Sequence, residues 1–434
     1  MYKAYITELK NVRPHPNADR LQLGDCFGNT VCVNLDYTEG QLGIYFPTDG
    51  QLSIEFAEYN NLLRKKDEAG NNIGGYMDPN KRNVCAIKLR GEKSDGLFLP
   101  LSSLEYTGAN LSTLRAGDVI DGTLNGHHIC QKYIPAVKVA EYNKQKYGSK
   151  IPKIKINLTP YFAEHIDTPQ LRFCQDMFKP GDYICLTEKV HGTSSRNANT
   201  LTVSYKRSLF DKIFHRKGKE IHEYKYVVGT RRTTVNESSG GFYGSNQFRL
   251  DWGERFKGKL NPGEEVYGEI AGFTGPNAPI MSRGDNKKTK DKQFIKTYGP
   301  TTIFSYGCDE EKGENRFFIY RMTYTTPEGM VIEYPWDLVK FRAEQMGFEV
   351  VPELERFIYT TQEDFMARIE KYMDIPSTID PRHIIEGVVV RALNAPNKFV
   401  VAKEKSFNFK VLESIIKVDA EVPDIEEAEE LVEL

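Results

Sequence analysis

The stretch TEKVHGTSSR, Thr187–Arg196, places a lysine between a predicted strand and a tight turn. The preceding residues, DYICLTE, are rich in the aromatic and β-branched side chains that favour strands. The following His191 and Gly192 begin a polar turn. Lys189 in this position is either a solvated surface charge or a nucleophile, and the rest of the chain must decide between the two.

A lysine that attacks phosphorus needs particular neighbours. Its amine ordinarily titrates near ~10.4, so nearby cations and partial burial are needed to disfavour the ammonium form. The same cations stabilise the negative charge of the phosphate in the transition state. Such a site therefore predicts four features: a turn that presents the lysine, carboxylates for a metal ion, cations for phosphates and an aromatic surface for a base.

All four features follow in order along the chain. Glu269 ends a predicted strand in VYGEIAG, and Glu386 begins another in EGVVVR. Lys403 and Lys405 alternate in VAKEK, so a strand would direct both side chains to one face. Between the two glutamates, RFFIYRM forms an aromatic strand that contains Phe317. Any one of these matches recurs by chance, but five in order are specific.

This ordered set resembles the covalent nucleotidyltransferase superfamily of polynucleotide ligases and capping enzymes. TEKVHGT is similar to its nucleophile motif, YGEIAG, RFFIYRM and EGVVVR to three further motifs, and VAKEK to the last, Lys-x-Lys. The set is most similar to the ATP-dependent, double-strand-specific RNA ligases. They also have a glutamate before the lysine, here Glu188, a histidine at the position of His191, and a basic pair, here Arg231 and Arg232. The resemblance covers about residues 160–410.

The resemblance and the residue patterns together predict an α+β chain in four parts. Residues 1–137 hold short β-rich runs separated by turns, and we expect an all-β OB-like barrel, as in the Deinococcus-type RNA ligases. On its own, the PHPNAD stretch fits a simple loop between strands equally well. Residues 138–159 read as a basic linker and residues 418–434 as an acidic tail with eight acids and no base. Residues 160–417 are expected to form the nucleotidyltransferase (ATP-grasp-like ligase) domain.

The expected catalytic domain consists of antiparallel sheets with flanking helices. Strands are expected around the five motifs and in TIFSYG, residues 302–307. Helices are expected at residues 168–178, 245–257, 336–346 and 361–373.

The resemblance also implies the reaction. Lys189 would attack the α-phosphate of ATP, pass the resulting AMP to a polynucleotide 5′-phosphate, and allow a 3′-hydroxyl to seal the nick. The implied catalytic residues are Lys189, His191, Glu269, Glu386, Lys403 and Lys405. The implied ATP-binding residues are Glu188, Lys189, Gly192, Arg196, Glu269, Phe317, Lys403 and Lys405.

Individual roles follow from side-chain chemistry. Glu386 and Glu269 are expected to hold Mg²⁺ or Mn²⁺, which prefer oxygen ligands. Arg231 and Arg232 are expected to bind RNA phosphates. In the nucleotide site, Glu188 is expected to select adenine, Phe317 to stack on it, and Arg196 to contact ribose or phosphate. His191 replaces an aspartate of many relatives and supplies no negative charge, so metal binding depends on the two glutamates or His191 mainly orients other groups.

Composition limits the remaining choices. The net charge is −2, and the chain without its acidic tail carries +6, with basic residues concentrated in Lys206–Arg232 and Arg283–Lys296. These segments suit contacts with nicked duplex RNA or RNA/DNA, or they are solvated loops. Seven scattered cysteines indicate reduced thiols. No stretch reads as a signal peptide or membrane span, so we expect a soluble, cytoplasmic monomer.

Two other functions remain open. A capping guanylyltransferase or a DNA ligase generally has its OB domain after the Lys-x-Lys motif, whereas only 29 residues follow Lys405. A non-catalytic RNA-binding protein would not need the lysine nucleophile, both glutamates and both distal lysines. The preference for RNA–RNA or mixed nicks, and the biological pathway, are not encoded in these motifs.

Overall fold

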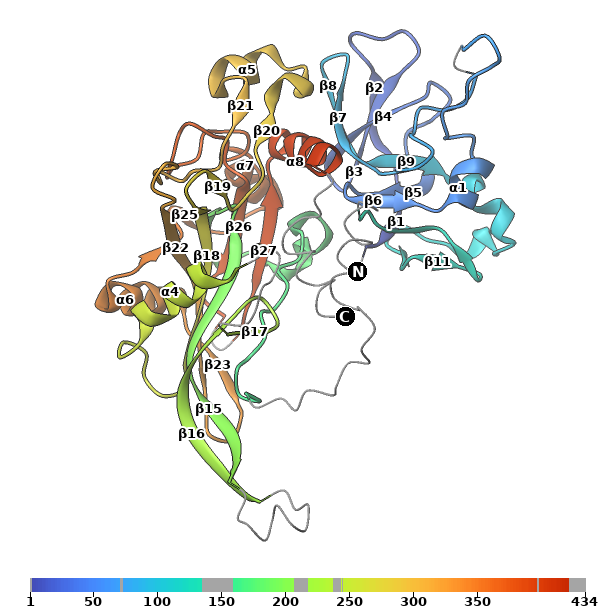
Figure 1. Ribbon diagram of the computed structural model, residues 1–434. Coiled ribbons are helices and arrows are strands. Elements are labelled where there is room, and N and C mark those ends of the chain that lie inside the picture. Colours follow the sequence, from blue (N-terminus) through green and yellow to red (C-terminus); the bar gives the residue numbers. More distant parts are fainter. Residues whose placement is uncertain are drawn as a thin grey trace. The chain divides into compact units, whose positions relative to one another are not determined.

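The structure of the chain is a computed structural model (Figure 1). It describes residues 2–70, 73–134, 159–206, 218–236, 243, 245–395 and 398–420. Of residues 418–420 it describes the backbone only. The chain forms two compact units. The first comprises Met1–Val139, Gly284–Pro300 and Phe407–Val422, and the second comprises Ala140–Arg283, Thr301–Ser406 and Pro423–Leu434. Residues 138–158 of the expected linker and residues 421–434 of the expected acidic tail lie outside the described residues.

The first unit is built mainly from short antiparallel strands. A four-stranded sheet has the order β10-β1-β5-β9, a three-stranded sheet the order β2-β3-β4, and three pairs complete the unit: β6 with β13, β7 with β8, and β11 with β12. The bounds are β1 Ala4–Glu8, β2 Lys10–Pro14, β3 Gln22–Cys26, β4 Asn29–Val33, β5 Leu42–Phe46, β6 Gly50–Leu52, β7 Ala86–Leu89, β8 Glu92–Asp95, β9 Leu97–Pro100, β10 Val119–Ile120, β11 Thr123–Leu124, β12 His127–His128 and β13 Cys130–Lys132. Its core includes Ile6, Ile44, Phe46 and Phe56, the last on helix α1 (Ile54–Tyr59).

Two later segments pack with these strands. One contains β20 (Gly284–Asp285) and helix α5 (Lys292–Tyr298), and the other is helix α8 (Phe407–Ala420). Phe407 and Val411 of α8 share a small apolar core with Ala86 of β7. Lys417 of α8 donates to Asp49 at 3.1 Å. Apolar and charged contacts therefore hold α8 in the first unit.

The second unit contains two sheets. One has the order β25-β14-β26-β27, with every pair antiparallel. The other follows β17-β16-β15-β18-β22-β23, with β19 paired to β18 and β24 parallel to β22. The bounds are β14 Tyr183–Lys189, β15 Thr193–Lys206, β16 Lys219–Gly229, β17 Thr234–Val235, β18 Glu264–Gly275, β19 Ala278–Pro279, β21 Thr301–Thr302, β22 Asn315–Thr325, β23 Val331–Glu333, β24 Glu349–Val350, β25 Glu353–Ile358, β26 Gly387–Ala392 and β27 Val401–Lys405.

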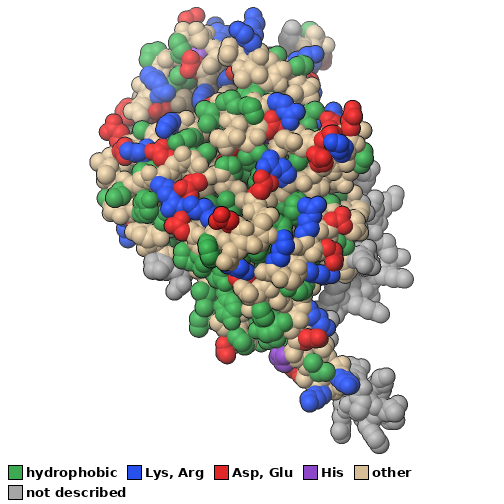
Figure 2. Space-filling model, turned by 90° about the vertical axis from the view of Figure 1, so that its left-hand side faces the viewer, with side chains coloured by type: hydrophobic (Ala, Val, Ile, Leu, Met, Phe, Trp, Pro, Cys, Tyr) green, Lys and Arg blue, Asp and Glu red, His purple; other side chains and the backbone are tan. Residues whose placement is uncertain are grey.

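Among the described residues, three helices cover these sheets: α4 (Gln247–Phe256), α6 (Trp336–Met346) and α7 (Gln362–Glu370). Local signals define their ends. Helix α6 follows Pro335 and ends before Gly347, whose φ of 73° suits glycine. Thr361 caps α7 by accepting a hydrogen bond from the Asp364 amide. The face of the molecule in Figure 2 carries interspersed acidic and basic side chains. No helix in the described part of the chain has the length and apolar composition needed to cross a membrane.

The expected mixture of antiparallel sheets and flanking helices is confirmed, as are helices near 245–257, 336–346 and 361–373. Two local predictions are wrong. Residues 168–178 form only two short 3₁₀ turns, Leu171–Phe173 and Gln175–Met177, because Cys174 leaves the helical region with φ −144°. The expected strand 302–307 ends at Thr302. The described pairings of the first unit do not close into a barrel, and its OB-like character and the exact domain limits stay predictions.

Candidate active site

Lys189 is the last residue of β14 and is followed by a turn that leads into β15. Strand β14 is the buried second strand of its sheet, so its backbone is fixed on both edges by β25 and β26. The turn passes so close to β18 that a Cβ on Gly192 would lie 2.3 Å from the carbonyl oxygen of Ile270. Glycine is therefore required there for a close backbone approach, which is a structural role.

The amine of Lys189 lies beside a buried carboxylate. Its Nζ donates to Oε2 of Glu386 at 2.8 Å, and Nζ of Lys405 lies 3.4 Å from Oε1 of the same group. The imidazole Nδ1 of His191 lies 3.7 Å from Oε2. Glu386 is only 2% exposed. Two lysines and a histidine from two distant parts of the chain, the end of β14 with the turn after it and strand β27, thus converge on one carboxylate.

The charge of Glu386 follows from these neighbours. Burial acts to raise its pKa, but Lys189, Lys405 and His191 outweigh burial and hold the pKa below its usual value. The carboxylate is therefore ionised throughout the neutral range. Gly387, the first residue of β26, allows a close approach of β27, because a Cβ there would lie 2.0 Å from the Glu404 carbonyl oxygen.

A cavity that is partly open to solvent lies beside Lys189. Its charged part is lined by Lys189, Glu269 and Lys403, and its apolar part includes Tyr320 and Val389. The other described lining residues are His165, Thr168, Glu188, Val190, Ser194, Arg231, Val351, Arg391, Phe399 and Val401. The cavity lies within the second unit. A site lined by cations as well as by aromatic and aliphatic side chains suits a molecule with a phosphate and a planar ring.

Comparisons with known proteins agree with this geometry. The family model described as "RNA ligase" matches residues 182–412, which is more than half of the chain. The chain belongs to the RNA ligase family. None of the curated proteins compared with it matches.

Solved structures of Naegleria gruberi RNA ligase share the fold. A variant solved with ATP and Mn matches with a TM-score of 0.55 at 16% identity, covering 94% of this chain and 98% of that chain. Another variant, solved with AMP and Mn, matches with a TM-score of 0.56 at 17% identity, covering 94% and 97%. The structure with PPi gives 0.55 at 16% identity, covering 96% and 99%.

In this member of the RNA ligase family, the fold brings together six of the predicted residues. The side chains of Lys189, His191 and Lys405 meet at the buried carboxylate of Glu386. Lys403 and Glu269 line the adjoining cavity, and Ser194 donates to Glu269 at 3.4 Å.

Phe317 does not reach this cavity, in contrast to the prediction. Its side chain is 1% exposed, and its ring packs 5.5 Å from that of Trp252 and 5.3 Å from that of Phe256, both on α4. The ring therefore belongs to the core between β22 and the helix. Tyr320, on the same strand, lines the cavity instead, and its hydroxyl lies 3.4 Å from Nδ1 of His165.

Glu188 is also placed differently from the prediction. Both of its carboxylate oxygens are already used: Ser377 donates to one at 2.6 Å, and the Thr378 amide donates to the other at 2.9 Å. Because neighbouring residues of a strand face opposite sides, Glu188 and Lys189 point apart. The carboxylate anchors the 377–378 loop, so this arrangement does not support its expected role in base selection.

Arg196 is a structural residue and does not line the cavity. It is 1% exposed, donates to the Thr230 carbonyl at 2.5 Å, and lies 4.1 Å above the ring of Phe162. Glu265 lies 3.6 Å from the guanidinium group. The expected contact with ribose or phosphate is therefore not available to it in this arrangement.

The basic pair is divided. Arg231 is buried, lines the cavity and forms an ion pair with Asp167, whereas Arg232 is more exposed and lies 3.8 Å from Asp167.

No prediction from the sequence included His165, Arg391 or Tyr306, which contact or line the site from distant segments. The EGVVVR motif contains a signal for Arg391, because alternation places it on the same strand face as Val389.

Proposed function

We propose that this chain is an ATP-dependent RNA ligase that seals 3′-hydroxyl and 5′-phosphate ends in nicked duplexes through a lysyl-AMP intermediate. The observation that carries the proposal is the amine of Lys189, which lies 2.8 Å from Glu386 and beside the cavity with Lys403 at its charged part. A lysine between further cations and a buried carboxylate is suited to attack on a phosphate.

The proposed reaction has three transfers. First, the deprotonated amine of Lys189 attacks the α-phosphorus of ATP. A P–N bond forms, the nitrogen releases a proton to solvent, the α–β P–O bond breaks and pyrophosphate leaves. Second, an oxygen of a polynucleotide 5′-phosphate attacks the same phosphorus, so the P–N bond breaks, the leaving nitrogen takes up a proton and AMP joins the 5′ end. Third, the 3′-hydroxyl loses its proton and attacks the activated 5′-phosphate, a phosphodiester forms and AMP leaves.

Lys403 and Lys405 would contact the α-phosphate, because they lie on one face of β27, and Lys189 lies on the same face of this sheet, with β26 between the two strands. Their positive charges would stabilise the charge that develops during each transfer. His191 lies against the ring of Phe304 at 4.7 Å and close to Glu386, so it would orient that carboxylate. Glu386 would hold the Lys189 side chain in place until the nucleotide arrives.

The residues present fit a divalent metal ion that is completed by substrate. No group of three or more potential metal ligands occurs among the described residues. Mg²⁺ typically takes only one or two protein carboxylates, with phosphate oxygens and water as its other ligands, and Glu386 and Glu269 would supply these carboxylates. When bound, Mg²⁺ or Mn²⁺ neutralises phosphate charge. The Naegleria ligase variant solved with ATP and Mn supports this choice.

The base of the nucleotide would lie in the apolar part of the cavity, between Tyr320 and Val389. These residues come from the two facing sheets. Stacking on a tyrosine ring accepts any base, so the wall predicts nucleotide binding but not the choice of adenine.

The polynucleotide would approach the phosphate end of the site. Arg231 and Arg232 would bind its phosphates, with Arg231 close enough to the cavity to reach the nucleotide as well. An OB-like first unit, as in the Deinococcus-type enzymes, would supply a second surface for the duplex. A monomer suffices for this scheme, since every proposed site residue belongs to one chain.

The proposal is tested by joining assays on duplexes that carry one nick. The panel varies the sugar on each side of the break and supplies either ATP or GTP. We expect joining with ATP where the 3′-hydroxyl end is RNA, and a loss of at least about a thousandfold in Lys189→Ala, because the nucleophile is removed. Covalent labelling of the protein by GTP and not by ATP would instead favour a guanylyltransferase. Equal joining by Lys189→Ala would exclude the covalent route.

A further inference from the structure

Tyr306 occupies an unusual backbone position close to the nucleophile. Its φ is 50°, in the left-handed region, and a bulky residue rarely adopts this conformation. The side chain is fully buried. Such strain persists only where the surrounding structure holds the residue in place, and it is found most often at functional sites.

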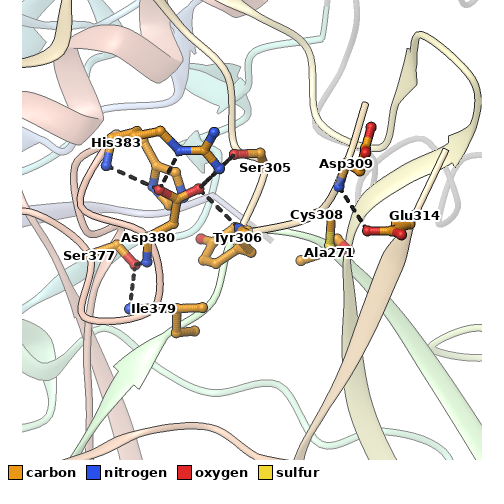
Figure 3. A network of polar contacts seen from close by, with 12 residues as sticks. Ala271, Ser305, Tyr306, Cys308, Asp309, Glu314, Ser377, Ile379, Asp380 and His383 are labelled. Carbon is orange, nitrogen blue, oxygen red and sulfur yellow. Dashed lines mark hydrogen bonds and ion pairs between the residues drawn. The ribbon is translucent and has the colours of Figure 1, made fainter. Parts of the chain in front are cut away.

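The residues around Tyr306 supply that restraint (Figure 3). Ser305 donates to Oδ2 of Asp380 at 2.6 Å, and the amide of Gly307 donates to the same oxygen at 3.0 Å. Arg316 donates to the carbonyl oxygen of Tyr306 at 2.8 Å. The backbone on both sides of Tyr306 is thus fixed by hydrogen bonds.

The phenol hydroxyl of Tyr306 reaches the turn after the nucleophile. It accepts a hydrogen bond from the backbone N–H of His191 at 2.6 Å, two residues beyond Lys189. Burial raises the pKa of Tyr306 well above its usual value, so the phenol stays neutral. The ring also packs 4.5 Å from that of His383, in the segment that leads to Glu386.

The residue before Lys189 is held by the same segment. The carboxylate of Glu188 accepts hydrogen bonds from Ser377 and Thr378, and the segment from there to Glu386 includes Asp380 and His383. The segment 377–386 is therefore connected to both flanks of the nucleophile: directly through Glu188, and through Tyr306 to His191.

We propose that Tyr306 is a positioning residue that fixes the turn after Lys189, so that the amine faces the α-phosphate and Glu386 together. This inference rests on the proposed lysyl-AMP route. It assigns a role to a strained, buried tyrosine that does not line the cavity. Its effect is confined to the step in which the lysine is the nucleophile.

The test compares two steps in Tyr306→Phe. The first is the rate of covalent adenylation at saturating ATP, together with the KM for ATP. The second is the sealing of a strand whose 5′ end already carries AMP, which does not need the lysine to attack. We expect about a tenfold slower adenylation, because one positioning hydrogen bond is lost. We expect the KM for ATP and the rate of sealing of the activated strand to change by less than about twofold. The thermal midpoint should change by less than about 2 °C.

Tyr372→Phe is the matched control. The Tyr372 hydroxyl is likewise hydrogen-bonded, here as the donor to Glu355 at 2.9 Å, but it is not connected to the nucleophile turn. Covalent adenylation and sealing of the activated strand should both be unchanged in Tyr372→Phe. A second variant, Tyr306→Asn, tolerates a positive φ and cannot reach His191, so it should slow adenylation at least as much as Tyr306→Phe.

The outcomes separate the inference from the proposed function. Unchanged adenylation in Tyr306→Phe, or an equal loss in both steps, would overturn the positioning role. If wild-type protein formed no adduct with ATP, the proposed function would fail and the inference with it.

Discussion

At the scale of single residues, Tyr320 and Phe317 show how strand alternation decides a role. Both are on β22, and their separation of three residues places them on opposite faces of the strand. Tyr320 accordingly lines the cavity, and Phe317 packs against α4. The pairing of β18 with β22 also shifts between Tyr267 and Gly268, so that Tyr320 has no direct partner on β18.

We therefore predict different effects for Tyr320→Leu and Phe317→Leu. Loss of the ring at Tyr320 should raise the KM for ATP about tenfold, because base stacking is worth roughly 1–3 kcal/mol. Phe317→Leu should leave this KM unchanged and lower the free energy of unfolding by about 1 kcal/mol, because it removes buried core volume. Steady-state kinetics and urea unfolding of both variants measure the two effects. A larger KM effect for Phe317→Leu would return the stacking role to Phe317.

The sequence predicted the charged part of the site better than its walls. Lys189, Glu386, Lys403 and Lys405 could be found because strand alternation and motif order fix where such residues point. The surroundings of Glu188 could not be found, because its partners lie about 190 positions away in sequence. Alternation in RFFIYRM separates Phe317 from Tyr320, but it does not indicate which of the two strand faces meets the cavity.

At the scale of elements, a charged network links helix α6 to strand β25. Glu353 of β25 accepts hydrogen bonds from Lys340 at 2.9 Å and from Trp336 at 3.1 Å, both on α6. Arg356 donates to Glu353 at 2.5 Å and also pairs with Asp337 of α6. The hydrogen bonds from Arg356, together with those from Lys340 and Trp336, outweigh burial and lower the pKa of Glu353 to about 2.

This shift predicts a pH dependence of stability. A carboxylate with a lowered folded-state pKa stabilises the protein above its unfolded value, near 4.5, and loses that contribution as the pH falls through about 2. Glu353→Gln should therefore cost about 2 kcal/mol at pH 7 and about half as much at pH 3, with solvent screening included.

Urea unfolding at both pH values measures the difference. Glu344→Gln, which neutralises an exposed carboxylate on helix α6, serves as the control and should show little change in unfolding free energy at either pH. A cost for Glu353→Gln that is independent of pH would show that the carboxylate charge does not contribute.

Elements with strong boundary signals could be predicted, and those defined by distant contacts could not. Helix α6 was predicted at its observed limits because Pro335 and Gly347 mark its ends. The TIFSYG stretch has the composition of a strand, but Tyr306 and Gly307 both have positive φ and form a turn. A hydrogen bond from the Gly307 amide to Asp380 and one from Arg316 to the Tyr306 carbonyl hold that turn, and these partners lie 73 and 10 positions away in sequence.

At the scale of the whole molecule, the chain order does not reveal how the units are composed. The segments 284–300 and 407–422 follow strands of the second unit in sequence but pack with the first. Lys405 ends β27 in the second unit, and α8 begins two residues later in the first. The apolar residues that place α8 are spaced as on any amphipathic helix, so the sequence gives no indication of which surface they cover.

The central claim is that one amine, that of Lys189, carries the nucleotide. Mass spectrometry of the intact protein after incubation with ATP and Mg²⁺, followed by sequencing of its peptides, tests this claim most directly. The account predicts the added mass of one AMP, located on Lys189, and none in Lys189→Ala. An adduct on another residue, or no adduct while nicks are still joined, would contradict it.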